Sequence, residues 1–262
     1  MFQPRVTDVS DVVRSVAASY PDDLREAVRS DLDRQAFHVG MAAALAPGGT
    51  VADVGGNYGM FSPGCQAAGM SAILIDDFSD PVNELIGEGE LSVHAALGVK
   101  VMRRDVIADG LGLEPESLDL LTSFDSMEHW HDSPKALFAE VMTVLKPGGW
   151  FLLGVPNCVN LRKRITVPLG RGKWSQMSDW YERPTFRGHV REPDVDDLGY
   201  IARDMGLVDW HVVGRNWLGY HNPRPWVRRV VPYVDGTLQR RPSLCSDLYL
   251  LGRKPLTAAG GR

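Results

Sequence analysis

The feature that most constrains this chain is a glycine-rich turn between an apolar run and an amphipathic segment. A mainly apolar run from Thr50 to Val54 leads directly into glycines at 55, 56 and 59. This order predicts a β-strand, a tight loop and an α-helix. Glycine has no Cβ, so such a loop can bend sharply and approach a ligand closely, while the first amides of the helix face the same place. The stretch therefore predicts a site for a small polar molecule.

The glycine spacing argues against a dinucleotide site, which requires Gly-x-Gly-x-x-Gly. Counted from Gly55, the third position is Asn57 and the sixth is Met60. Asparagine adopts a left-handed backbone more readily than most residues, so Asn57 is compatible with the turn. Similar turns also occur in α/β proteins without any ligand, and the motif needs support from the rest of the chain.

Apolar runs and helical patterns alternate along the 262 residues, which fit one large α/β domain. Apolar runs without polar alternation are typical of parallel strands that are covered on both faces. The predicted strands lie at 50–54, 71–75, 99–102, 117–124, within 146–157, at 207–213 and at 247–252, and the predicted helices at 9–18, 24–45, 60–68, 80–98, 135–145 and 195–205. We therefore expect seven strands with helices on both faces.

The composition excludes few functions but sets useful limits. The formal net charge of -5 gives no overall attraction to nucleic acid or to an anionic membrane, so any anion-binding surface must be local. Charged residues are frequent in the first thirty positions, and no apolar run approaches the length of about 18 residues of a membrane span. We expect a cytoplasmic protein. Cys65, Cys158 and Cys245 are far apart, which predicts three reduced thiols without a zinc site or disulfide.

An acidic residue directly follows the second predicted strand. Asp76 lies 23 residues after Asp53, where a Rossmann-like site presents a carboxylate to the two hydroxyls of a ribose. We favour Asp76 over Asp77 because Asp76 adjoins the strand. The ordinary structural alternatives are a helix N-cap and a solvated acid.

The turn and several later stretches resemble the class I S-adenosylmethionine-dependent methyltransferases, in particular their small-molecule "type 11" branch. Asp53-x-Gly55-x-Asn57-x-Gly59 is similar to the family motif Asp/Glu-x-Gly-x-Gly-x-Gly, with Asn57 in place of the middle glycine. The likeness continues through the acids at the next two strand ends, the Glu128-His129 pair after the fourth strand and the Lys146-Pro147-Gly148-Gly149 turn, and it covers about residues 48–213.

The resemblance implies a Rossmann-like, seven-stranded, mostly parallel sheet with an antiparallel last strand, and S-adenosyl-L-methionine as methyl donor. By the same resemblance, Asp105 accepts a hydrogen bond from the adenine amino group and Val106 lies against the ring. The residues expected at the cofactor are Asp53, Gly55, Gly56, Asn57, Gly59, Asp76, Asp105, Val106 and Phe124. We expect a methyltransferase that acts on an oxygen atom of a small metabolite or of a natural-product, sugar or lipid-linked intermediate.

A sulfonium methyl is already electrophilic, so the protein must mainly hold the donor, align the acceptor and exclude water. When the acceptor is a hydroxyl group, a general base helps, and the candidates are His129, His131 and His189. A structural role for His129 is the alternative.

Asp125-x-x-Glu128-His129 also resembles the Glu-x-x-Glu-His ligand set of ubiquinone-pathway O-methyltransferases and small-RNA 2'-O-methyltransferases, in which a divalent cation grips the acceptor oxygens. Asp125 stands where that set has glutamate. Oxygen and imidazole ligands suit Mg²⁺ or a similar ion, so a cation at Asp125, Glu128 and His129 is a second hypothesis for these residues.

The segment 157–191 carries eight basic residues against two acidic ones, together with Trp174, Trp180, Tyr181 and Phe186. In an acidic chain this asymmetry predicts a cover over a small substrate that bears an anionic group. A surface insertion anchored by its aromatic residues is the alternative. We divide the chain into an N-terminal helical cap (1–46), whose helices pack on the sheet edge or cover the substrate, and a methyltransferase domain (47–262). Insertions at about 158–190 and 214–246 are expected on the substrate side.

Two other functions fit parts of this pattern. The basic segment and the Asp-x-x-Glu-His set would suit an RNA 2'-O-methyltransferase, but the acidic net charge and the lack of an appended RNA-binding module favour a small-molecule substrate without nucleic acid. A non-catalytic partner subunit with the same fold would have no need for the acids at 53, 76 and 105.

Overall fold

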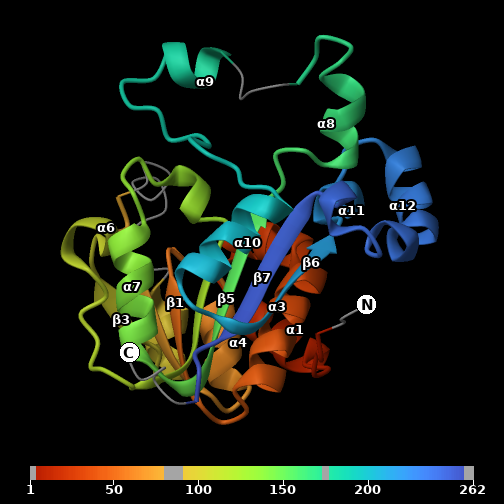
Figure 1. Cartoon of the computed structure of the whole chain (residues 1–262). Coiled ribbons are helices and arrows are strands. Elements are labelled where there is room, and N and C mark those ends of the chain that lie inside the picture. The colour runs from red at the N-terminus through yellow and green to blue at the C-terminus, as the bar shows by residue number, and fades with distance from the viewer. Residues whose placement is uncertain (1–3, 80–90, 173–176, 257–262) are drawn as a thin grey trace.

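One sheet of seven strands organises the chain in the computed structural model, which describes residues 4–79, 91–172 and 177–256. The strands follow the order β3-β2-β1-β4-β5-β7-β6 (Figure 1). Their bounds are β1 Thr50–Val54, β2 Ser71–Asp76, β3 Lys100–Arg103, β4 Leu118–Phe124, β5 Leu145–Pro156, β6 Val208–Arg215 and β7 Asp247–Arg253. Strands β1 to β5 pair in parallel, whereas β7 runs antiparallel to both β5 and β6. The predicted Rossmann-like topology with an antiparallel last strand is confirmed.

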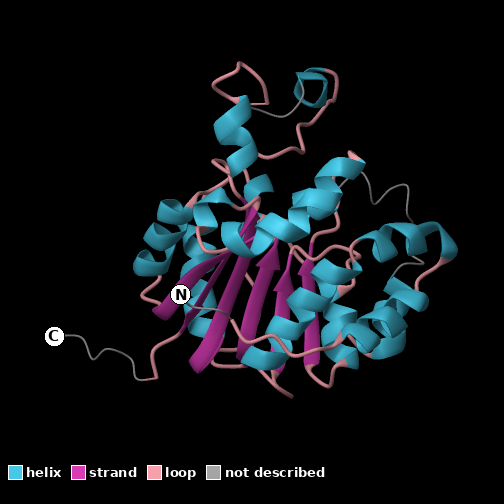
Figure 2. Cartoon of the chain, turned by 90° about the vertical axis from the view of Figure 1, so that its right-hand side faces the viewer, coloured by secondary structure: helices cyan, strands magenta, loops and turns pink. Residues whose placement is uncertain are grey.

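Helices cover both faces of the sheet (Figure 2). One face carries α1 (Ser10–Ala18), α2 (Asp22–Ser30), α3 (Leu32–Leu45), α4 (Phe61–Ala67) and α5 (Leu91–Leu97), and the other carries α6 (Val106–Asp109), α7 (Lys135–Val144) and α10 (Val195–Asp204). The central strands serve both cores, because Leu120 and Leu152 pack into the first cluster and Leu121 and Leu153 into the second. This two-sided burial explains the uninterrupted apolar runs of the sequence.

Four of the described helices lie outside these two layers. They are α8 (Leu161–Thr166) and α9 (Met177–Tyr181) after β5, and α11 (Trp217–Tyr220) and α12 (Pro225–Leu238) after β6. Figure 1 shows α8 and α9 standing away from the sheet, beyond the carboxyl ends of the parallel strands. Among the described helices, none has the length and apolar character that crossing a membrane requires.

Two predicted helices differ from the structure. The single helix expected over 24–45 is divided into α2 and α3 at Asp31, whose side chain accepts a hydrogen bond from Gln35 Nε2 (3.1 Å). Serine and aspartate at 30 and 31 compete with helical backbone bonds, which explains the break. Of the helix expected over 80–98, residues 80–90 lie outside the described part, and α5 begins at Leu91.

Candidate active site

Backbone conformation and close contacts require glycine at two positions of the turn after β1. Gly55 (φ +72°) and Asn57 (φ +48°) both adopt the left-handed region, as the sequence predicted for Asn57. A Cβ on Gly55 would overlap the Ser126 hydroxyl, and a Cβ on Gly56 would overlap the Asp53 carboxyl group. Glycine is therefore required at 55 by both conformation and space, and at 56 by space.

The two acids at the end of β2 have different surroundings. Asp76 is half-buried and accepts hydrogen bonds from the Asn57 amide (2.8 Å) and from the Phe78 amide (2.7 Å). Asp77 is exposed and accepts hydrogen bonds from Ser79. Only Asp76 is thus fixed against the glycine turn.

The strand ends and the glycine turn enclose a first cavity of about 280 Å³. Among the predicted cofactor residues, Gly55, Asn57, Asp76, Asp105 and Val106 line it, as do His129 and Arg187. Asp105 also caps α6, since its Oδ1 accepts hydrogen bonds from the amides of Ile107 and Ala108.

A second cavity of about 110 Å³ lies between the same turn and α3. It is lined by the remaining predicted cofactor residues, Asp53, Gly56, Gly59 and Phe124, and again by Gly55. The Phe124 ring stacks on His38 of α3, with the ring centroids 4.0 Å apart and the planes parallel within 1°. All nine predicted cofactor residues therefore line one of two neighbouring cavities that share Gly55 and Asp125.

Polar groups from α3 dominate the second cavity. Arg34 forms an ion pair with Asp125, and the buried Nε of Arg34 has no hydrogen-bond partner among the described residues. His38 Nε2 lies 2.8 Å from the Tyr249 hydroxyl, and burial together with the nearby Arg34 lowers the pKa of His38 well below its usual range. A neutral histidine and a half-buried cation thus form one wall.

Asp53 lies beneath the glycine turn. Its carboxyl group is buried and accepts a hydrogen bond from Thr122 Oγ1 of β4 (2.9 Å). Burial raises the pKa of Asp53 to about 7, and the nearby Asp76 acts in the same direction. This residue supports the turn from within the sheet.

Beside the first cavity, Glu128, His129 and His189 bring one potential ligand atom each to within 4.8 Å of one another. The two imidazole rings meet edge to face with centroids 4.9 Å apart, and His189 Nε2 lies 4.0 Å from Glu128 Oε1. Glu128 is buried, which raises its pKa to about 7, and its Oε2 has no hydrogen-bond partner in the described part of the chain. This donor set could hold a divalent cation.

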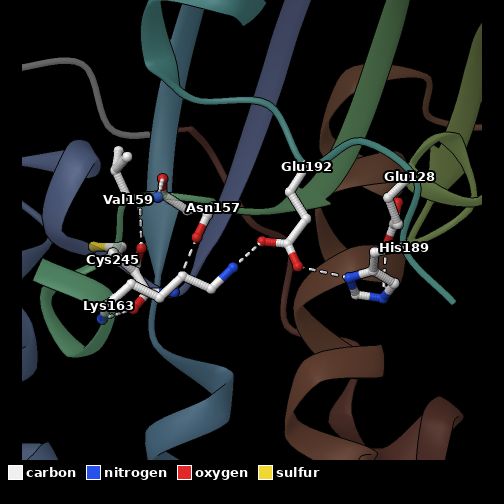
Figure 3. A network of polar contacts seen from close by, with 8 residues as sticks. Glu128, Asn157, Val159, Lys163, His189, Glu192 and Cys245 are labelled. Carbon is white, nitrogen blue, oxygen red and sulfur yellow. Dashed lines mark hydrogen bonds and ion pairs between the residues drawn. The ribbon is translucent and has the colours of Figure 1, made fainter. Parts of the chain in front are cut away.

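Each histidine of this cluster is oriented through Nδ1. The His129 Nδ1 lies 2.9 Å from the Arg187 carbonyl, which can only accept, so Nδ1 carries the proton. His189 Nδ1 lies 2.7 Å from Glu192 Oε1, and Glu192 also pairs with Lys163 (Figure 3). Although its partial burial acts the other way, hydrogen bonds from His189 and Lys163 lower the pKa of Glu192 to about 2. The Glu192 carboxylate in turn raises the pKa of His189.

The structure places the other predicted site residues differently from the sequence-based expectation. Asp125 pairs with Arg34 and is absent from the Glu128 cluster, where His189 supplies the third potential ligand. His131 is exposed and lines neither cavity. Of the basic, aromatic segment, Lys173 and Trp174 lie outside the described residues.

Three polar residues near the two cavities, Arg34, His38 and Glu192, were not singled out in the sequence. Asp31, Arg34, Gln35 and His38 follow the spacing of one helix face, so a polar stripe marks the wall that α3 contributes. Glu192 carries no local signal, because its role comes from a contact with His189 and Lys163.

The chain has clear relatives. A family model described as a methyltransferase domain matches residues 23–212. The ubiquinone biosynthesis O-methyltransferase of Burkholderia pseudomallei is 30% identical over 181 residues, covering 69% of this chain and 72% of that protein.

Solved structures share the fold at low identity. A possible histamine N-methyltransferase from Thermotoga maritima superposes with a TM-score of 0.55 at 14% identity, covering 92% of this chain and 99% of that one. Phosphoethanolamine N-methyltransferase 2 of Haemonchus contortus, in complex with S-adenosyl-L-methionine, superposes with a TM-score of 0.55 at 17% identity. The match covers 85% of this chain and 52% of that one.

The contact between Gly56 and Asp53 generates a stability prediction. Gly56→Ala should lower the free energy of unfolding in urea by about 1–3 kcal/mol, because the new methyl group overlaps a buried carboxyl group. Gly236→Ala in α12 is the matched control, since a Cβ there meets no atom within 4 Å. Equal stability of the two variants would contradict the required close approach.

Proposed function

The chain belongs to the S-adenosylmethionine-dependent methyltransferases, and on this premise we propose that it methylates an oxygen atom of a small metabolite. The observation that carries the proposal is the convergence of Glu128, His129 and His189 beside the cavity of the glycine turn. Such a set either binds a cation that grips acceptor oxygens or removes a hydroxyl proton, and both roles serve O-methylation. The relative in B. pseudomallei, an O-methyltransferase by name, supports the same choice.

We assign the adenosyl part of the donor to the first cavity and the methionine part to the second. The fit rests on Gly55 and Gly56, where any side chain would fill the cradle. Asp76 would accept hydrogen bonds from the ribose hydroxyls, the carboxylate of Asp105 would accept one from the adenine amino group, and Val106 would pack on the ring. The donor supplies an electrophilic sulfonium methyl group.

Arg34 is assigned to the carboxylate of the methionine part. Its guanidinium group lines the second cavity, and its buried Nε needs an acceptor. The ion pair with Asp125 holds the guanidinium at the boundary of the two cavities. This role would make α3 part of the donor site as well as of the fold.

A divalent cation would be held by Glu128, His129 and His189. The unpartnered Oε2 of buried Glu128 and the Nδ1 hydrogen bonds of both histidines fit this role, because metal-binding histidines usually donate their other N–H to an oxygen. When bound, the ion would lower the pKa of the acceptor hydroxyl and orient its oxygen. The protein's own part is to fix the histidine rings and to keep water away.

The segment after β5 completes the acceptor side in this proposal. Val190 N donates a hydrogen bond to the Glu128 carbonyl (2.7 Å). This bond ties residues 187–192 to the backbone at Glu128, the first residue of the Glu128–His129–His189 cluster. Arg187 of this segment lines the first cavity and would attract an anionic acceptor. We therefore keep residues 158–190 and 214–246 as the substrate side of the domain 47–262, with residues 1–46 as its helical cap.

The assignment of Asp76 predicts a specific loss of donor affinity. Asp76→Ala should weaken binding of S-adenosylhomocysteine, measured by isothermal titration calorimetry, about 10- to 100-fold, because a charge-assisted bond to the ribose is lost. Asp77 also lines the first cavity, but its exposed carboxylate accepts hydrogen bonds from Ser79 and not from the glycine turn, so Asp77→Ala should weaken binding far less. If the two variants bind alike with intact folds, the ribose lies elsewhere.

The cation hypothesis predicts that a chelator abolishes methyl transfer and that Mg²⁺ or Mn²⁺ restores it. Binding of Mn²⁺, followed by electron paramagnetic resonance, should be lost in Glu128→Gln. It should be retained in Glu182→Gln, because Glu182 is an exposed residue of the segment 157–191 outside the Glu128 cluster. Full activity in the presence of the chelator would rule out a catalytic cation and leave the histidines as acid–base residues.

The Glu192–His189 contact predicts a shift in the pH profile. Protonation of His189 blocks its role as ligand or base, and the Glu192 carboxylate raises the pKa of His189. Glu192→Gln should therefore lower that pKa and move the acidic limb of kcat/KM to lower pH, with a maximal rate reduced by about 10- to 100-fold. Glu182→Gln serves again as control. An acidic limb that stays in place would show that His189 does not govern it.

A further inference from the structure

An apolar stripe on the outer side of α12 is exposed, with no other described element packed over it. Trp226, Val230, Tyr233 and Val234 project from it, and Trp226 and Tyr233 are 64% and 88% exposed. These positions follow the spacing of one helix face. Two large aromatic side chains that are mostly in solvent, with valines between them, form more than a scattered apolar surface.

The opposite side of α12 anchors the helix. Val231 and Asp235 are buried, and the Asp235 carboxylate accepts hydrogen bonds from Asn216 (2.6 Å), Tyr220 (2.9 Å) and Gln239 (2.8 Å). The helix cannot turn its outer stripe inward without breaking the bonds from Asn216 and Tyr220. The exposure of the stripe is therefore a fixed property of the fold.

The stripe lies in a strongly basic stretch. Between residues 222 and 242 the exposed charged side chains are Arg224, Arg228, Arg229, Arg240 and Arg241, and the single acid, Asp235, is buried. In a chain of net charge -5 this is a local concentration of positive charge.

The neighbouring α8 extends the same surface. Arg164 Nη2 of α8 donates a hydrogen bond to the Ser243 carbonyl (3.3 Å), just beyond the end of α12. Near this contact Ile165 and Leu169 are 57% and 71% exposed, and Arg162 is exposed. Figure 1 shows α8 and α12 on the same side of the molecule, beyond the sheet edge that carries the site.

We propose that α12 and α8 bind the surface of an anionic lipid bilayer. Tryptophan and tyrosine favour the interface between water and acyl chains, the aliphatic side chains gain by entering it, and the arginines meet lipid phosphates. A second copy of the chain fits less well, because an isologous contact would bring two sets of five arginines together. Nucleic acid would pair with the arginines but leave the aliphatic side chains in water.

The test is co-sedimentation of the full chain with vesicles of phosphatidylglycerol and phosphatidylcholine, compared with phosphatidylcholine alone. We expect binding to the mixed vesicles that weakens as salt is added. Trp226→Ser and Tyr233→Ser should each reduce the vesicle partition constant about tenfold. Arg228→Glu or Arg229→Glu should reduce the same constant by at least about fivefold. Tyr200→Ser, at an exposed tyrosine of α10, should have no effect, and circular dichroism checks the fold of each variant.

Three results would overturn the proposal. One is the absence of binding to the anionic vesicles. The second is a dimer in light scattering that Trp226→Ser dissociates, which would assign the stripe to a second copy. The third is tight binding of a single-stranded oligonucleotide that the arginine substitutions abolish while vesicle binding persists.

Discussion

The site depends on the burial of one carboxyl group beneath the glycine turn. Asp53 is the penultimate residue of β1. It accepts a hydrogen bond from Thr122 of the adjacent strand and occupies the space where a side chain at Gly56 would lie. The turn can therefore lie directly on the strand ends, where the Asn57 amide reaches Asp76. Without this close approach, the two cavities on either side of the turn would not share a wall.

The second organising contact joins distant parts of the chain. His129 and the carbonyl of Glu128 bind the segment 187–192 that returns after β5, and this segment brings His189 and Glu192. The polar cluster is thus assembled from two stretches about sixty residues apart. A change in the path of the second stretch would alter the histidine pair while leaving the donor cavities intact.

Local rules made the fold and the turn predictable. Strand ends of a parallel sheet meet at one edge, so Asp76 and Asp105 could be placed near Gly55 from the sequence alone. Arg34 was missed because its helix was interpreted by its apolar face, and Glu192 because it acts through contacts distant in sequence. The spacing of Asp125 suggested a metal ligand, but packing against α3 gives this carboxylate to Arg34.

The insertion of β7 between β5 and β6 has a consequence for the order of assembly during synthesis. Among the described strands β6 pairs only with β7, so it has no neighbour in the sheet until residues 247–253 exist. Tyr249 of β7 also supplies the hydroxyl group that meets His38. A ribosome must therefore add β7 before the wall behind the second cavity can close, and a nascent chain that stops short of β7 leaves β6 and α3 without these contacts.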